Sequence, residues 1–584
     1  MKGFRILFIA FFMNNMLLIW SQQKYFTIPY DKNHNMTMRY EEVISLCKKV
    51  DSLFDEVKLD TLGFSSNGSW IPMLRVSRPN KNEKIKLFIN AGIHSGESEG
   101  MDAGFLFLRD LLVNSFAQKW LDDVEVYFVP VFNVEGLQRF SPYNRINQNG
   151  PEQMGWRTNA LNLNLNRDFL KADAPEMRAW LTVFHRIKPD FLVDCHTTDG
   201  ADYQYTITYS LGNHPLFDDT LRNFLNAKLI PYLKDNLDKS GYLTAPYVVF
   251  RNWHNPRSGL VRDIASPHLT HGYTLMYDIP SLLVETHMLK PYELRVDGTE
   301  RLLLYLTQWL IENKKEFKKK LSIAQSKDIC KAEKKILPLD IEIDFKDSTM
   351  VDFLGYAYDS IKSEVTGQYY LRYNREKPET WKIPYYGKWV ITSSTNLPYA
   401  YVIPAQYGEL VKILSYHNIQ VLTLKTNENV KCKTYYLHNV SFPTSPYEGR
   451  FQPTYEVIEK DTILEVKKGS YVVPLCQKGW RVLAYLLEPA SSYSFLKWGF
   501  FNSIFEQKEY GEVYVLEPLA AEMIKDPAIK SAFENWKKQH PKASRYEQLN
   551  WFYLQSKYKD SYMNWYPILK VMEPVEYRQL IPQR

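Results

Sequence analysis

The sequence lacks several features that would place it in a specialised class of protein. Its five cysteines are scattered and form no CxxC pair, which argues against a disulfide framework and a cysteine-rich zinc site. The net charge of +6 over 584 residues is too dilute to indicate a nucleic acid or an anionic membrane as partner. With 45% hydrophobic residues and no repeat or biased tract, the chain is a globular protein of two or more domains.

Long apolar runs are also lacking, except at the N-terminus. There the charged residues Lys2 and Arg5 precede the stretch "ILFIAFFMNNMLLIW", and the small residue Ser21 follows it. This order is typical of a secretory signal, and we assign residues 1–22 to a signal peptide. The alternative is a membrane anchor, but the stretch has 15 residues with two central asparagines, fewer than the ~20 apolar residues that a span needs. We therefore expect an exported protein, periplasmic or secreted, with no stable membrane span after cleavage.

Residues 23–325 alternate β-type apolar runs with helical patterns, which predicts an α/β domain with a mixed, mainly parallel sheet flanked by helices. The predicted strands are "KIKLFINAG", "VEVYFVPVFN", "DFLVDCH" and "SLLVETH". The predicted helices are "GMDAGFLFLRDLLVNS", "APEMRAWLTVFHRI" and one closing helix, "RVDGTERLLLYLTQWLIENKKEFKKKL". The pattern weakens around residues 323–340, where we place the domain boundary.

Residues 335–584 form a second predicted domain, β-rich with a helical end. Within it, "AYVIPAQYGELVKILSYHNIQVLTL" predicts a strand, a helix and a strand, and "GSYVVPLCQKGWRVLAYLLEP" predicts a sheet hairpin. From "EPLAAEMIKDPAIKSAFENWKKQHP" onward the spacing becomes helical. No motif in this domain indicates chemistry. It can pack against the first domain or bind a surface or glycan, and we favour packing.

Three of the predicted strands end in residues that can bind a metal. His94 and Glu97 follow the first, His196 ends another, and Glu285 lies on the last. In a parallel sheet these ends share one edge, where ligands bind. Two histidines and one carboxylate are the protein ligands of a hydrolytic zinc site. We therefore predict one Zn²⁺ ion held by His94, Glu97 and His196.

Two neighbouring residues are interpreted differently. Glu99 lies five residues from His94, a looser spacing than that of Glu97, so we place it at the surface or just outside the metal ligands. Cys195 precedes His196 in the strand and therefore points to the opposite face. We interpret Cys195 as a buried core thiol.

Six motifs in order resemble the zinc carboxypeptidase family, metallopeptidases of the carboxypeptidase A type. They are "HSGE", "PVFNVEGL", "WRTN", "LNLNRDF", "DCH" and "LLVET", and together they span about residues 40–315. The first resembles the family's HxxE zinc motif and the last its strand with the catalytic glutamate. The resemblance implies the zinc carboxypeptidase fold for the first domain.

The resemblance also implies a role for each matched residue. His94, Glu97 and His196 would bind zinc, and Glu285 would be the general base and then the proton donor. Arg157 would stabilise the oxyanion, while Asn166 and Arg167 would hold the terminal carboxylate of the substrate. Each role has a physical reason, since a carboxylate accepts the proton of the attacking water and a cation offsets the charge that develops on oxygen. The planar fork of arginine also suits a carboxylate.

The sequence departs from the family pattern in two places. Asn164 stands where the family usually has an aspartate that orients a zinc-bound histidine. Its carbonyl can still accept the N–H but raises the ligand's basicity less, so we expect the metal affinity or the rate to differ. The family's substrate-binding tyrosine has no counterpart in residues 251–272. Tyr273 and Tyr277 are the nearest candidates upstream of Glu285. His268 and His271 are interpreted as hydrogen-bonded loop histidines, with a position in the cleft as the alternative.

Three functions fit these residues. The first is a zinc metallocarboxypeptidase that hydrolyses the last peptide bond of a substrate with a free C-terminus, using Glu285 as general base. The second is a zinc-dependent deacylase or amidase acting on acylated amino acids or cell-wall peptides, suggested by "DCHTTDG". The third is a peptide-binding protein that keeps the fold without turnover. The filled catalytic positions favour the first.

Overall fold

The computed structural model describes residues 25–80, 82–327, 329–331 and 336–581, so the predicted signal peptide lies outside the described residues. Contacts divide the chain into two compact units. Unit 1 comprises Met1–Leu397, Gly408–Val421 and Pro474–Leu486, and unit 2 comprises Pro398–Tyr407, Leu422–Val473 and Leu487–Arg584. The proposed domain boundary between residues 325 and 335 stays a prediction.

Unit 1 is built on a mixed sheet of eight strands in the order β1-β2-β4-β3-β5-β9-β6-β7. The strands are β1 (Val57–Phe64), β2 (Trp70–Val76), β3 (Ile85–Asn90), β4 (Val124–Val129), β5 (Phe191–Thr198), β6 (Ile207–Ser210), β7 (Thr244–Pro246) and β9 (Ser281–His287). The central strands β4, β3, β5 and β9 are parallel, whereas β1, β2 and β4 are joined in antiparallel pairs, as are β9 and β6. The predicted fold class and all four predicted strands are confirmed.

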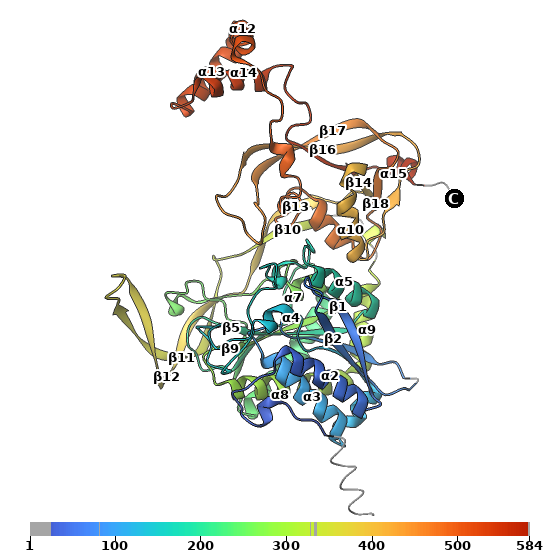
Figure 1. Cartoon of the computed structure of the whole chain (residues 1–584), viewed down its shortest axis with the longest axis vertical. Coiled ribbons are helices and arrows are strands. Elements are labelled where there is room, and N and C mark those ends of the chain that lie inside the picture. Colours follow the sequence, from blue (N-terminus) through green and yellow to red (C-terminus); the bar gives the residue numbers. More distant parts are fainter. Residues whose placement is uncertain (1–24, 81, 328, 332–335, 582–584) are drawn as a thin grey trace, which may run out of the picture. The chain divides into compact units, whose positions relative to one another are not determined.

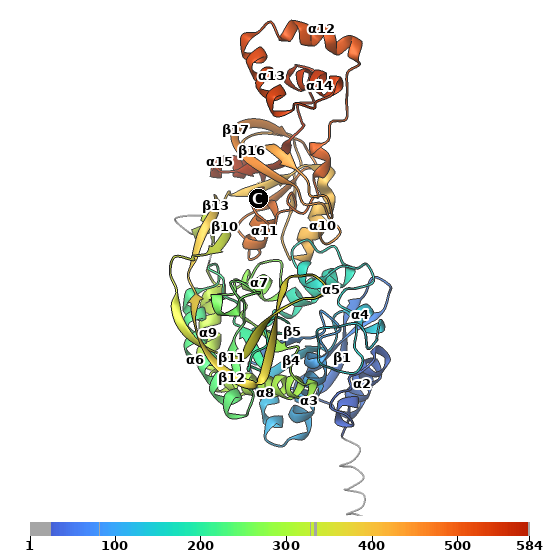
Figure 2. The ribbon, with the colours of Figure 1, turned by 90° about the vertical axis from the view of Figure 1, so that its left-hand side faces the viewer.

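Helices cover both faces of this sheet, with α3 and α8 on one side and α5 and α7 on the other (Figures 1 and 2). The helices are α2 (Tyr40–Leu53), α3 (Glu99–Val113), α4 (Val134–Gln138), α5 (Pro175–Ile187), α6 (Asp219–Lys239), α7 (Thr270–Leu275), α8 (Tyr292–Glu312) and α9 (Lys314–Gln325). The single closing helix predicted over residues 295–321 is wrong, because two helices, α8 and α9, meet at Asn313. Helix α5 begins at Pro175, which needs no N–H partner there.

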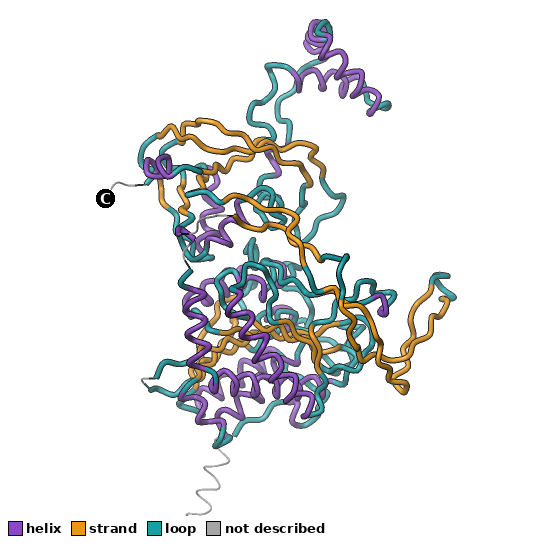
Figure 3. The backbone as a smooth tube through the Cα atoms, turned by 180° about the vertical axis from the view of Figure 1, so that it is seen from behind, coloured by secondary structure: helices purple, strands orange, loops and turns teal. Residues whose placement is uncertain are grey.

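A long hairpin of unit 1 pairs with the segment between β7 and α7. Its strands β11 (Thr349–Lys362) and β12 (Tyr369–Tyr386) run side by side in Figure 3. The end of β12 pairs with the short strand β8 (Leu260–Val261), and the N–H of Arg262 donates to the carbonyl of Tyr386 at 3.0 Å. Strands β10 (Ile336–Ile343) and β13 (Trp389–Asn396) form another pair.

Unit 2 contains a six-stranded sheet in the order β15-β18-β14-β19-β16-β17. The strands are β14 (Ala400–Ile403), β15 (Leu422–Thr423), β16 (Glu428–Ser441), β17 (Thr454–Val466), β18 (Tyr471–Pro474) and β19 (Trp565–Val571). The remaining α-helices of the described residues are α10 (Gly408–Tyr416), α11 (Trp480–Leu487), α12 (Val513–Met523), α13 (Pro527–Gln539), α14 (Arg545–Gln555) and α15 (Pro574–Leu580). Helices α12, α13 and α14 share a small apolar core around Phe533.

The predictions for the second half of the chain are confirmed in part. The strand, helix and strand predicted over residues 400–424 are β14, α10 and β15, and the helical end is confirmed by α12 and α13. The hairpin predicted over residues 469–489 is wrong, because β18 is followed by the helix α11. A short apolar run such as "VLAYLL" fits a buried helix as well as a strand. Among the described residues, none of the helices has both the length and the apolar character needed to cross a bilayer.

Candidate metal and catalytic site

The strand ends of the unit 1 sheet bring the predicted metal ligands to one edge. His196 on β5 and Glu285 on β9 are register partners on neighbouring parallel strands. His94 and Glu97 lie in the turn that follows β3, where the N–H of Glu97 donates to the carbonyl of His94 at 2.9 Å. The sheet therefore places these four residues together although they are far apart in the sequence.

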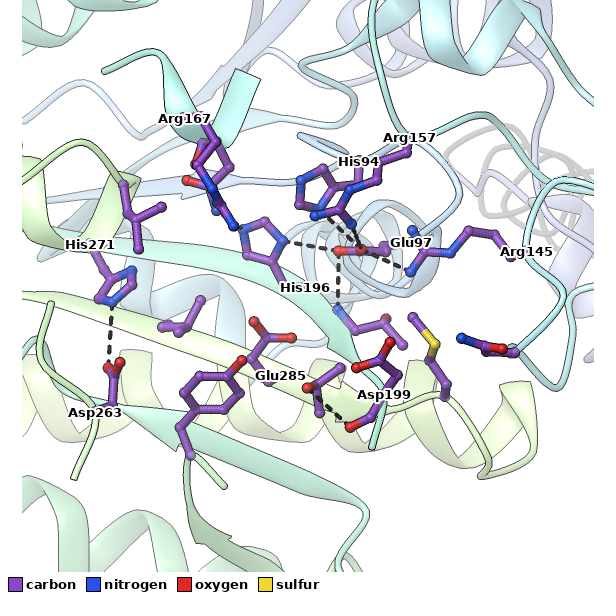
Figure 4. A pocket seen from close by; sticks show the side chains of 18 of the residues that line it. His94, Glu97, Arg145, Arg157, Arg167, His196, Asp199, Asp263, His271 and Glu285 are labelled. Carbon is purple, nitrogen blue, oxygen red and sulfur yellow. Dashed lines mark hydrogen bonds and ion pairs between the residues drawn. The ribbon is translucent and has the colours of Figure 1, made fainter. Parts of the chain in front are cut away.

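The ligand atoms of His94, Glu97 and His196 all lie within 4.8 Å of one another (Figure 4). The Nδ1 atom of His94 is 3.0 Å from one carboxylate oxygen of Glu97, and the Nδ1 atom of His196 is 2.9 Å from the other. All three residues are buried. Two imidazole nitrogens and a carboxylate converging in this way are a donor set that fits a hydrolytic zinc ion.

Glycine at position 96 is required for this turn. A Cβ atom added to Gly96 would lie 2.8 Å from the Cγ atom of Arg145 and 2.8 Å from the carbonyl oxygen of Gly155. Both distances are shorter than a carbon atom tolerates, so a larger residue would displace the Arg145 side chain. Gly96 therefore lets Arg145 approach Glu97, to which its guanidinium donates at 3.0 Å.

The two histidines are supported by different groups on their other ring nitrogen. The Nε2–H of His94 donates to the amide oxygen of Asn164 at 2.9 Å, whereas that of His196 donates to the carboxylate of Asp194 at 2.8 Å. Asp194 is itself held by the side-chain amide of Asn90 at 2.9 Å, its register partner on β3. These contacts fix both rings with Nδ1 facing Glu97, which is how outer groups orient metal-binding histidines.

The different supports give the two histidines opposite electrostatic properties. Burial lowers the pKa of His94 to about 4. Burial also disfavours the charged form of His196, but the carboxylates of Asp194 and Glu97 outweigh it and raise its pKa well above the usual value. Burial opposes the charge of Glu97 too, yet His94, Arg145 and His196 together hold the pKa of that carboxyl well below its usual range. The site thus keeps Glu97 ionised and able to bind a cation.

Glu285 and Tyr247 lie next to the three candidate ligands. Burial raises the pKa of Glu285 to about 8, against the opposing effect of His196. The negative charge of Glu285, followed by burial, raises the pKa of Tyr247, so this phenol stays protonated and can donate a hydrogen bond. A carboxyl group with a raised pKa beside a metal-binding group is a typical acid–base arrangement.

The three remaining predicted site residues line the same cavity. The guanidinium of Arg157 is 3.7 Å from Glu97 and its side chain is 44% exposed, so it can meet a ligand. Arg167 donates to the carbonyl oxygen of Asn166 at 2.7 Å. The amide oxygen of Asn166 accepts from both the N–H and the hydroxyl of Thr270 at 3.1 Å, which leaves its Nδ2 group facing His196.

The structure corrects the surface placement of Glu99. Glu99 is buried at the start of α3 and forms an ion pair with the buried Arg295. Arg295 also donates to the carbonyl oxygens of Asn149 and Gly150 at 2.7 Å, so this pair ties α3, α8 and a loop together. Cys195 is buried as predicted and packs where Gly100 leaves room for it.

Neither tyrosine proposed from the sequence lines the cavity. Tyr273 and Tyr277 lie in a separate group with His185 and His417, in which Tyr273 and His417 are buried and the other two are half-buried. Tyr247, in the loop between β7 and β8, lines the cavity instead.

Arg145 and His271 were also missed or misinterpreted. Arg145 comes from a loop without a local pattern and contacts Glu97. His271 is not a hydrogen-bonded loop histidine, because it lies in α7, lines the cavity, and neither ring nitrogen has a hydrogen-bond partner within the described part of the chain. Its neighbour His268 is not among the residues that line this cavity.

The cavity itself has a volume of about 500 Å³. The candidate metal ligands lie in its middle, with Asp263 and His271 at one end and Arg145 and Asp199 at the other (Figure 4). Arg167 lies on the side of His271. The cavity therefore presents different chemistry on the two sides of the candidate metal ligands.

Comparisons with known proteins agree with this geometry. Residues 43–269 match the sequence model of the zinc carboxypeptidase family, a range that includes His94, Glu97, Arg157, Asn166, Arg167 and His196 and ends before Glu285. The curated carboxypeptidase 2 of Trichophyton tonsurans is 20% identical over 440 residues, covering 73% of this chain and 75% of that protein. The carboxypeptidase 2 of Trichophyton rubrum is 20% identical over 438 residues, covering 72% and 74%.

Solved structures of similar proteins match a smaller part of the chain. A metallo-carboxypeptidase from Burkholderia cenocepacia is 18% identical and covers 46% of this chain and 69% of its own, with a TM-score of 0.34. The assignment therefore depends on the family match and on the curated relatives. From these, the chain contains a region, residues 43–269, that matches the zinc carboxypeptidase family of metallopeptidases.

Proposed function

We propose that this protein is a metallocarboxypeptidase that removes the last residue of a peptide with a free C-terminus. The single observation that carries the proposal is the convergence of His94, Glu97 and His196 within 4.8 Å, in a cavity that Glu285 also lines. Arginines on two sides of this group supply the cations that peptide hydrolysis needs. A zinc ion bound by these three residues would act as a Lewis acid, polarising the scissile carbonyl and lowering the pKa of a water molecule.

The substrate would be held by its terminal carboxylate. Arg167 offers a planar pair of N–H donors that matches a carboxylate, and Asn166 beside it offers one further N–H group. Because the oxygen of Asn166 is already bonded to Thr270, its amide is oriented before a ligand arrives. A substrate held in this way loses little entropy on reaching the reactive geometry.

The bond-breaking step would use Glu285 and Arg157. Glu285 takes a proton from the attacking water and returns it to the amine that leaves, and its raised pKa suits both transfers at neutral pH. Arg157 offsets the negative charge that develops on the carbonyl oxygen. Tyr247, close to Glu285, can donate a hydrogen bond to the substrate or to the leaving amine.

We also propose that one zinc ion is bound per chain and that the protein is exported. Among the described residues, His94, Glu97 and His196 are the one group of side chains placed to hold a metal ion. Export is supported by the disulfide between Cys330 and Cys476, because such bonds persist in oxidising compartments. Cys47, Cys195 and Cys432 are buried and free.

A mixed peptide library tests the proposal, with products read by mass spectrometry. The expected result is loss of single C-terminal residues, abolished by a chelator. Matched peptides with free and amidated C-termini separate the carboxypeptidase from a deacylase or amidase, because only the carboxypeptidase requires the free carboxylate. Zinc binding without any hydrolysis across the library would contradict the proposal and identify a binding protein.

A further inference from the structure

Arg145 lines the cavity, and the proposed mechanism assigns no role to it. Its guanidinium donates to the Oε1 atom of Glu97 at 3.0 Å, and only 7% of its side chain is exposed. Arg157, in the same segment between α4 and α5, lies 3.7 Å from the same oxygen atom, but 44% of its side chain is exposed. Figure 4 shows both guanidinium groups facing Glu97. Two arginines therefore meet one carboxylate oxygen, and Arg157 is the one with room to turn towards a ligand.

The carboxylate of Glu97 is held by one donor on each oxygen atom. The main-chain N–H of Thr197 donates to Oε2 at 3.2 Å, and Arg145 donates to Oε1. The same two oxygen atoms face the Nδ1 atoms of His196 and His94, at 2.9 and 3.0 Å. Two donors that are not themselves candidate ligands thus fix the orientation of the carboxylate towards the histidines, as outer groups do at metal sites.

The segment that carries Arg145 is anchored to the turn with the candidate ligands. The N–H of Gln148 donates to the carbonyl oxygen of Arg145 at 3.0 Å and closes a turn. The side-chain amide of Gln148 donates to the carbonyl oxygen of Gly96 at 2.8 Å and to that of Gly150 at 3.0 Å. Gly96 immediately precedes Glu97 in the sequence. Main-chain and side-chain contacts therefore hold Arg145 against the carboxylate that it contacts.

We propose that Arg145 is a positioning residue that holds the Glu97 carboxylate ready for a metal ion and leaves Arg157 free for the substrate. This inference rests on the proposed function. Because Arg145 occupies Oε1, Arg157 can leave that atom and offset the charge on the scissile carbonyl without leaving a buried carboxylate oxygen unpaired. When Arg145 is removed, Arg157 takes its place at Glu97 and is drawn away from the substrate.

Zinc affinity, measured by competition with a chelating dye on the metal-free protein, tests the positioning role without depending on hydrolysis. Arg145→Met removes the guanidinium and is expected to weaken zinc binding by about 10- to 100-fold, the usual cost of losing an outer partner of a ligand. Arg157→Met is the matched change at the exposed arginine, and it leaves the affinity within about 5-fold of the parent. Arg145→Lys keeps the charge and is expected to bind zinc more tightly than Arg145→Met.

Steady-state kinetics at saturating zinc separate positioning from a purely structural role. Arg145→Met is expected to keep its KM and to lose about 10-fold in kcat, whereas Arg157→Met loses about 100-fold, the cost of removing a donor to the oxyanion. Because Arg145 acts on kcat through Arg157, the double variant should be no slower than Arg157→Met alone. Thermal unfolding of the same samples shows that each variant is folded.

The outcomes distinguish this inference from the proposed function. Parent zinc affinity in Arg145→Met, or equal weakening in Arg157→Met, overturns the inference and leaves the proposed function intact. If the affinities follow the expected order but the parent cleaves no peptide, the proposed function is wrong and the positioning of Glu97 by Arg145 stands. Gln148→Leu removes the amide that anchors Arg145 and decides the question if Arg145→Met does not fold. Its zinc affinity should fall by a smaller factor, and parent affinity in this variant would contradict the inference.

Discussion

Unit 1 contains two groups of buried titratable side chains that differ in their surroundings. The cavity group consists of His94, Glu97, His196 and Glu285, and it combines carboxylates with histidines at a solvent-accessible edge. The second group, called here the enclosed group, consists of His185, Tyr273, Tyr277 and His417, all within unit 1. Tyr273 and His417 are buried, and His185 and Tyr277 are half-buried. The enclosed group contains no carboxylate.

Hydrogen bonding separates the two groups most clearly. In the enclosed group, Tyr273 contacts His185 at 3.0 Å and His417 at 2.9 Å, while His417 donates to the carbonyl oxygen of Leu170 at 2.9 Å. Its members are held neutral, because burial lowers the pKa of His185 to about 3 and that of His417 to about 4. The cavity group instead holds opposite charges close together. Buried histidine and tyrosine side chains thus indicate function where they lie beside charged groups that line a cavity.

The largest expected effect comes from Glu285 in the cavity group. Glu285→Gln removes the proton acceptor without changing the shape of the side chain, so kcat should fall by about 1,000-fold or more. Because the parent buries an acid with a raised pKa, the amide should not lower the thermal midpoint. Steady-state kinetics and a melting curve on the same samples check both points. Hydrolysis at the parent rate would exclude Glu285 as the general base.

The enclosed group should affect stability through pH. His417 has an ordinary pKa of about 6.5 when unfolded and about 4 when folded. As the pH falls, the unfolded chain therefore binds a proton before the folded chain does. His417 does not affect the free energy of unfolding above pH 6.5, and it lowers this free energy by about 3 kcal/mol between pH 6.5 and 4.

Denaturant unfolding at several pH values measures this loss. A His417→Gln variant serves as the control, since its free energy of unfolding should vary less with pH over this interval than that of the parent. Identical pH dependence in both proteins would show that His417 is not the neutral buried group described here.

The supports of His94 and His196 predict an intermediate effect on metal binding. Asp194→Asn removes the carboxylate behind His196 and should weaken zinc binding by about 10- to 100-fold. Asn164→Asp is the matched change behind His94 and should strengthen binding. Competition with a chelating dye on metal-free protein measures both affinities. Equal affinities in the three proteins would contradict the orienting role of these residues.

The smallest effect is expected for Tyr273→Phe. This change removes the hydroxyl that links His185 and His417, leaving both rings without that partner. Unfolding should require about 1–3 kcal/mol less free energy, with kcat/KM unchanged. Loss of activity with retained stability would place Tyr273 in the functional group instead.

Much of the site could be predicted because its chemistry lies at the ends of apolar strands. His94, Glu97, His196 and Glu285 each follow or lie within an apolar run, and parallel strands place such ends at one edge. The main-chain register of β5 and β9 then makes His196 and Glu285 neighbours.

The residues that the sequence did not reveal come from segments without periodicity. Arg145, Tyr247 and Asp263 lie in loops whose course depends on distant elements, such as the pairing of β12 with β8 that precedes Asp263. The sequence places Glu99 at the surface or just outside the metal ligands, because its partner Arg295 is almost 200 positions away. The apolar run of α11 fits a strand as well as a helix, because a short apolar run has no distinctive period.

The central claim is that His94, Glu97 and His196 hold the zinc ion on which hydrolysis depends. The most direct measurement is a zinc titration of the metal-free parent, with bound zinc and peptide hydrolysis recorded in the same samples. We predict that both rise together and saturate at one equivalent per chain, and that a His196→Ala variant shows neither under the same conditions. Hydrolysis by the metal-free parent, or saturation of the His196→Ala variant at the same zinc concentration, would contradict the claim.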